Sequence, residues 1–180
     1  MRAMGPGSVS SFLKTILDVV YFVLLASLGV LVVAAIAGVL LSFSPDLLQR
    51  ISSRLEINGA AGDVGDLIPM LGVGVIYLIL NASALLVIIG RLRRVFATLT
   101  AGDPFDPENV RRLRLIGFVL GGMEIARYAF GVIFEAVAPD VSRLEGGINL
   151  TAWFAVLVVF VLAEVFREGA RLRREAELTI

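Results

Sequence analysis

The stretch ILDVVYFVLLASLGVLVVAAIAGVLLSF, residues 16–43, decides the fold of this chain. It carries a single charged side chain, Asp18, in a long apolar run. A helix rises about 1.5 Å per residue, so roughly 20 apolar residues cross a hydrocarbon core about 30 Å thick. The apolar part of a secretory signal is only about 7–15 residues long, so we expect this run to remain as a membrane anchor.

Three further apolar runs follow the first, over about residues 67–90, 113–137 and 148–166. The composition agrees with a membrane protein, because 58% of the 180 residues are hydrophobic and the mean hydropathy is +0.90. A typical soluble domain has only about 45–50% apolar residues. We therefore predict an all-α fold, an integral membrane four-helix bundle, which forms a single membrane domain over residues 1–180.

Basic residues are unevenly distributed between the two sides of the predicted spans. Arg50, Arg54 and Arg143 lie on one side. The other side has Arg2, Lys14, Arg91, Arg93, Arg94, Arg111, Arg112, Arg114, Arg167, Arg171, Arg173 and Arg174. Cytoplasmic loops carry the excess of Lys and Arg. The pattern predicts an N-in/C-in protein of the inner (cytoplasmic) membrane, with loop 91–112 and tail 167–180 in the cytoplasm.

The chain has no Cys and no His, and this narrows its chemistry. A Cys nucleophile, a His general base, and zinc sites built from these residues are excluded. Basic and acidic residues number 16 each, so the chain has no net charge to attract nucleic acid. We expect a protein of the lipid bilayer that is not an enzyme, has no cofactor or metal, and binds no nucleic acid directly.

The stretch AGDPFDPENVRRLRLIG, residues 101–117, predicts a turn followed by a helix start. Gly102 and Pro104 are typical turn residues. Asp106 suits the N-cap, and a proline follows it at the first helical position, where no backbone N–H is needed. Asn109 then begins the body of the helix that becomes the third span.

Phe105 precedes this cap, so its ring is expected to pack against Val110 or to enter the lipid headgroups. The tail FREGARLRREAELTI, residues 166–180, is predicted to continue the fourth helix out of the membrane. Arg171 and Glu175 are spaced for an i,i+4 ion pair. The arginines of this tail suit anionic headgroups, at about 1 kcal/mol each.

The turn and the tail together resemble a known family. The residues that carry the resemblance are Gly102, Asp103, Pro104, Phe105, Asn109, Arg111, Arg112 and Leu113, then Phe166, Arg167, Glu168, Gly169, Ala170, Arg171 and Leu172, and last Glu177–Ile180. They are similar to DUF2975, a family of small bacterial four-span membrane proteins of uncharacterised function. The resemblance implies no catalytic residues. Members are often encoded beside a small helix-turn-helix DNA-binding regulator, so it implies such a regulator as a partner.

Two charges lie in the middle of the third span. Glu124 is ten residues past Arg114, hence about 15 Å deep. A charge there costs at least about 2.5–3.5 kcal/mol. Arg127 is one turn further and leans back toward Glu124, which predicts an ion pair. Asn81 and Tyr77 of the second span fall at similar depths, so we predict an intramembrane polar cluster of these four residues.

Three functional interpretations follow. The leading one is a membrane protein whose cytoplasmic face, with Arg111, Arg112, Arg171 and Arg173 as its basic residues, recruits or sequesters a helix-turn-helix regulator. The alternative is a small transporter or proton-linked carrier that uses the Glu/Arg pair. A structural homo-oligomer is the third. The pair then serves as polar glue between helices, whereas the GxxxG of Gly117 and Gly121 is interpreted as packing within the bundle.

Overall fold

The computed structural model describes residues 9–44, 64–137 and 147–178. These ranges form four long helices and no strand. The helices are α1 (Val9–Ser42), α3 (Val64–Thr100), α4 (Pro107–Val137) and α5 (Leu150–Glu177). Each of them is long and apolar enough to cross a membrane. The predicted all-α fold with four membrane-length helices is confirmed, and the protein is a multi-pass membrane protein.

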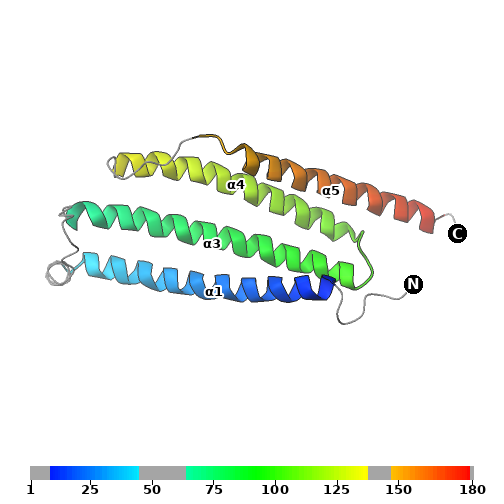
Figure 1. The fold of residues 1–180 in the computed structure, drawn as a ribbon, viewed down its shortest axis with the longest axis horizontal. Helices are drawn as coiled ribbons and strands as arrows, with labels where there is room; N and C mark the ends of the chain where they lie inside the picture. Colours follow the sequence, from blue (N-terminus) through cyan, green and yellow to red (C-terminus); the bar gives the residue numbers. More distant parts are fainter. Residues whose placement is uncertain (1–8, 45–63, 138–146, 179–180) are drawn as a thin grey trace.

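The helices lie side by side in sequence order, and neighbours run in opposite directions (Figure 1). The main contacts join α1 to α3, α3 to α4 and α4 to α5. As a result, α1 begins, α3 ends, α4 begins and α5 ends at one end of the molecule. We call this the arginine-rich end. An N-in/C-in protein requires this arrangement, while the orientation itself stays a prediction.

A belt of four charged residues crosses the helices near this end. Asp18 of α1 pairs with Arg93 of α3 at 2.5 Å, and Arg114 of α4 pairs with Glu164 of α5 at 3.8 Å. The two pairs are level, because Thr98 and Asn109 contact each other across the antiparallel α3–α4 pair and lie five residues from Arg93 and Arg114. The belt suits one edge of the hydrocarbon core, where ion pairs lie near the headgroups.

A small core lies just beside the belt, where α3, α4 and α5 meet. Its buried members are Leu113, Ile116 and Ala163, and those packed against them are Ile88, Leu120, Val159 and Phe166. Large apolar side chains elsewhere are exposed, among them Phe22, Val30, Phe118, Phe154 and Val161. An exposed apolar surface of this extent is typical of helices that face lipid.

Small residues let α4 and α5 approach closely. A Cβ at Gly117 would lie 3.0 Å from the ring of Phe160, and one at Gly121 would lie 3.9 Å from Val156. The GxxxG motif therefore faces a neighbouring helix of the same chain, as the sequence interpretation held.

Candidate functional site

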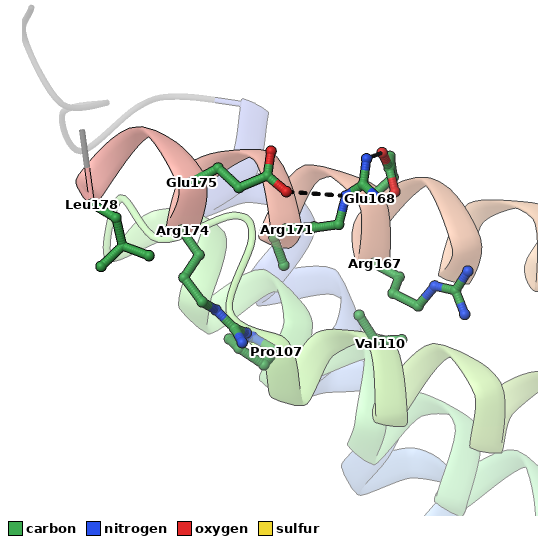
Figure 2. Close-up of a pocket in the computed structure, with 9 residues that line it drawn as sticks. Pro107, Val110, Arg167, Glu168, Arg171, Arg174, Glu175 and Leu178 are labelled. Carbon is green, nitrogen blue, oxygen red and sulfur yellow. Dashed lines mark ion pairs between the residues drawn. The ribbon is translucent and has the colours of Figure 1, made fainter.

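The tail helix, which we define as residues 167–177 of α5, carries most of its charges in pairs (Figure 2). Arg171 lies 2.6 Å from Glu168 and 3.6 Å from Glu175, which confirms the predicted i,i+4 pair. Arg167 pairs with Glu164 of the belt. These pairs are exposed, so each contributes at most about 1 kcal/mol. They keep the helix continuous well past the belt.

The turn between α3 and α4, residues 101–106, is closed by its own backbone. Gly102 has a φ of +84°, in the left-handed region that favours glycine. The amide of Gly102 donates to the Leu99 carbonyl at 3.2 Å, and the amide of Asp103 donates to the Thr98 carbonyl at 3.0 Å. This pattern is a Schellman motif, which ends α3 and sends the chain back toward α4.

The predicted cap of α4 is present. The Glu108 amide donates to Oδ1 of Asp106 at 2.9 Å, and Pro107 is the first helical residue. Together the two caps place the turn between the ends of α3 and α4.

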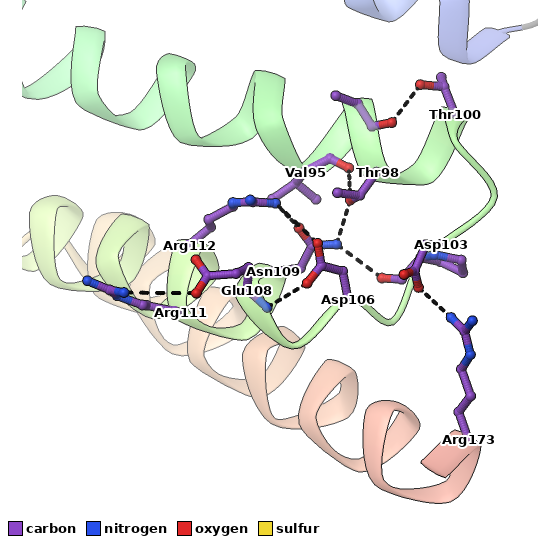
Figure 3. Close-up of polar contacts among 12 residues, drawn as sticks. Val95, Thr98, Thr100, Asp103, Asp106, Glu108, Asn109, Arg111, Arg112 and Arg173 are labelled. Atoms are coloured by element: carbon purple, nitrogen blue, oxygen red, sulfur yellow. Dashed lines mark hydrogen bonds and ion pairs between the residues drawn. The ribbon is translucent and has the colours of Figure 1, made fainter. Parts of the chain in front are cut away.

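Asn109 ties the two helices together, and it is the one fully buried polar residue of the described chain (Figure 3). Its Nδ2 donates to Oγ1 of Thr98 at 2.7 Å and to the carbonyl of Pro104 at 3.2 Å. Its Oδ1 accepts from Arg112 at 2.8 Å. From the sequence, Asn109 was predicted only to begin the body of the helix. The sequence did carry a sign of its burial, because Asn109 is a polar residue at a position of the helix that faces inward.

The turn rests on the tail helix, and we call this junction the turn–tail contact. The Phe105 ring lies against Gly169, where a Cβ would overlap it, and 6.0 Å from the ring of Phe166. Phe105 thus packs on α5, a neighbour that the sequence did not predict; its expected packing on Val110 or entry into the headgroups stays a prediction. Asp103 forms an ion pair with Arg173. Hydrogen bonds to Glu177 and Asp103 raise the pKa of Arg173 above its usual value.

Within the membrane, Arg127 Nε lies 3.1 Å from Oε2 of Glu124, so the predicted pair forms. The Glu124 side chain is 14% exposed, and that of Arg127 is 33% exposed. Arg127 also donates to the carbonyl of Gly147 at 3.3 Å, next to the start of α5. The Asn149 amide donates to the hydroxyl of Tyr128 at 3.1 Å. These bonds hold the beginning of α5 against α4.

Among the described residues, no hydrogen bond or ion pair joins Asn81 or Tyr77 to this pair. The Nδ2 of Asn81 donates to the Tyr77 carbonyl at 3.2 Å, within α3. The Tyr77 ring packs on Phe130 at 5.2 Å. The four residues that the sequence grouped are therefore two separate pairs, one within α3 and one within α4.

Three contacts were missed by sequence reasoning: Asn109 with Thr98, Phe105 with Gly169, and Asp103 with Arg173. Each contact joins residues of two different segments, so no local sequence pattern predicts it. Gly169 did carry a signal, because glycine inside an exposed helix costs about 1 kcal/mol relative to alanine and often marks a close approach.

Comparison with known sequences identifies the family of the chain. The sequence model of DUF2975, described as a protein of unknown function, matches residues 60–180. The chain belongs to the DUF2975 family. The matched region holds α3, the turn, α4 and the tail helix, while α1 precedes it. No curated protein and no solved structure matches the chain.

Proposed function

We propose that this DUF2975 protein is a non-enzymatic membrane protein of the inner membrane whose arginine-rich end lies in the cytoplasm and recruits a soluble regulator. A small helix-turn-helix DNA-binding protein is the partner favoured by the family resemblance. Recruitment would hold the regulator at the membrane and away from its DNA.

The observation that carries this proposal is the turn–tail contact. It joins the two segments on which the family resemblance rests, through Phe105 with Gly169 and Asp103 with Arg173. Side chains 60 or more residues apart thereby form one surface. A surface built in this way suits recognition of a folded partner better than two separate loops would.

The reach of the tail helix supports a partner in water. Glu177 lies thirteen residues past Glu164 of the belt, hence about 20 Å further out. The headgroup region adds only about 5–7 Å to each side of the hydrocarbon core. Leu172 is 54% exposed on this projecting part, where lipid tails do not cover it.

The test is co-expression of the tagged protein with a helix-turn-helix protein encoded beside its gene, followed by membrane fractionation. We expect the regulator in the membrane fraction with wild type and in the soluble fraction with the Arg111→Glu/Leu172→Glu variant. The Arg111 side chain is 85% exposed, so the change leaves the turn intact. Arg112 is unsuitable, because it bonds Asn109 inside the turn.

The matched control is Lys14→Glu, the same charge reversal at an exposed position of α1. It should leave the regulator on the membrane. Equal release by Lys14→Glu would reduce the effect to bulk charge, and a soluble regulator with wild type would contradict recruitment.

A further inference from the structure

A groove of about 520 Å³ lies between the first turns of α4 and the tail helix (Figure 2). Its apolar lining includes Pro107, Val110 and Ala170, and three arginines stand along it. The turn–tail contact is a different surface, because neither Phe105 nor Arg173 lines the groove. The groove therefore needs an explanation of its own.

One cation in the groove has no acidic partner within the described chain. Arg167 and Arg171 each have a carboxylate nearby, whereas Arg174 forms no ion pair among the described residues. Its side chain reaches toward Pro107 at the start of α4 in Figure 2. An arginine offers five N–H donors in a planar fork that matches phosphate oxygens. The positive end of the α4 dipole adds to the attraction for an anion.

The groove begins at the level of lipid headgroups. Val110 is four residues from Arg114 of the belt and Arg167 is three residues from Glu164, so they lie about 4–6 Å beyond it. Side chains of a helix lean toward its N-terminus, which for α5 is the direction of the membrane. Arg174 lies ten residues past Glu164, hence about 15 Å beyond the belt, and this lean brings its guanidinium back along the groove toward the outer edge of the headgroup layer.

We propose that this groove binds the headgroup of one phospholipid, with its phosphate on Arg174 and its glycerol against Val110 and Ala170. The charge pattern favours this occupant. Three arginines and two glutamates line the groove, so the lining has a small positive charge. Such a site recognises a phosphate and does not require a lipid of net negative charge. The proposal is independent of the regulator, because no protein partner is needed for it.

The test measures the thermal stability of the full-length protein in an alkyl maltoside detergent, which has no phosphate. Phosphatidylglycerol and phosphatidylethanolamine are added in turn. We expect both lipids to raise the Tm of wild type, and the rise to be about 2–4 °C smaller in Arg174→Gln. Arg174→Lys, which keeps the charge but loses the fork, should be intermediate.

Arg111→Gln is the matched control, since it removes the same charge from an exposed side chain nearer the belt. General attraction to headgroups would affect Arg111→Gln at least as much, and that outcome would overturn the proposal. For each variant, the Tm with lipid is compared with the Tm of the same variant without lipid. A variant that starts from a lower Tm can therefore still be compared with wild type.

Two further additives identify the source of the phosphate. A galactosyl diacylglycerol, which has no phosphate, should not distinguish wild type from Arg174→Gln. Glycerol 3-phosphate should not replace the lipid, and an equal shift with it would make the ligand a soluble phosphate instead. An equal rise in Tm with lipid for wild type and Arg174→Gln would overturn the lipid site. A protein segment would then be the occupant of the groove to test next. These Tm measurements do not depend on the regulator, so a failure of the co-expression test would not change the results expected here.

Discussion

Gly169 shows how one residue without a side chain can join two distant segments. It lies inside the exposed tail helix, where alanine is normally better by about 1 kcal/mol. Here the absence of a Cβ makes room for the ring of Phe105. The cost to the helix is therefore offset by packing of the turn onto α5.

This account predicts that Gly169→Ala weakens the protein although alanine is the better helix former. The new methyl group displaces the Phe105 ring, and overpacking of this kind costs about 1–3 kcal/mol. Thermal unfolding in detergent measures the loss. Gly122→Ala is the control, because nothing lies within 4 Å of a Cβ there, and it should be neutral or stabilising. A stabilised Gly169→Ala would contradict the packing, and adding Phe105→Ala should remove most of its cost.

Asn109 is the second decisive residue, and its prediction concerns hydrogen bonds. Asn109→Leu removes the hydrogen bonds to Thr98, to the Pro104 carbonyl and to Arg112. Thr98 keeps its bond to the Val95 carbonyl, and Arg112 keeps Asp106 at 3.9 Å, so the Pro104 carbonyl is the group that loses most. Each unsatisfied buried group costs about 1–3 kcal/mol, so a clear loss of Tm is expected. Thr98→Val should lose less, and the double variant should lose less than the sum, because both changes act on one network. Additive losses would show that the two residues act separately.

At the scale of elements, the Glu124–Arg127 pair anchors the start of α5 on α4. Arg127→Gln leaves the mostly buried Glu124 charge unpaired and removes the bond to Gly147. Glu124→Gln leaves an arginine that is one-third exposed and keeps its bond to Gly147. We therefore expect Arg127→Gln to lower the Tm more than Glu124→Gln does.

The double variant tests whether the charges serve only each other. Glu124→Gln/Arg127→Gln should recover part of the stability, short of wild type because the Gly147 bond stays lost. A carrier predicts a stable double variant without transport. Two single variants as stable as wild type would show that neither charge depends on the other.

The elements differ in how far the sequence could predict them. The four apolar runs and the Asp106 cap are local patterns, so their helices were predictable. The same holds for Arg171 with Glu175, which lie on one helix face. Asp103 with Arg173 was not predictable, because it depends on how α5 is positioned against the turn. Asn81 shows the converse, since equal depth on α3 does not ensure a neighbour on α4.

At the scale of the whole molecule, the helices form a row in sequence order, with the belt of Asp18, Arg93, Arg114 and Glu164 across it. Glu135 of α4 lies 21 residues beyond Arg114, hence about 31 Å away along the helix. This separation matches a hydrocarbon core about 30 Å thick. On α4, the belt and Glu135 therefore bracket the segment that we assign to the bilayer.

This frame yields the topology prediction, which the absence of cysteine makes simple to test. Single variants Arg111→Cys, Asn58→Cys and Glu145→Cys are treated in intact cells with a thiol reagent that does not cross the membrane. Asn58 and Glu145 lie outside the described residues, in the loops that the arginine distribution assigns to the external side. We expect labelling at these two positions, and labelling of Arg111→Cys only after the cells are opened, because arginine-rich loops stay in the cytoplasm. External labelling of Arg111→Cys would show that the protein has the opposite orientation in the membrane. It would place the turn–tail contact and the groove outside the cell, where a DNA-binding regulator does not reach them.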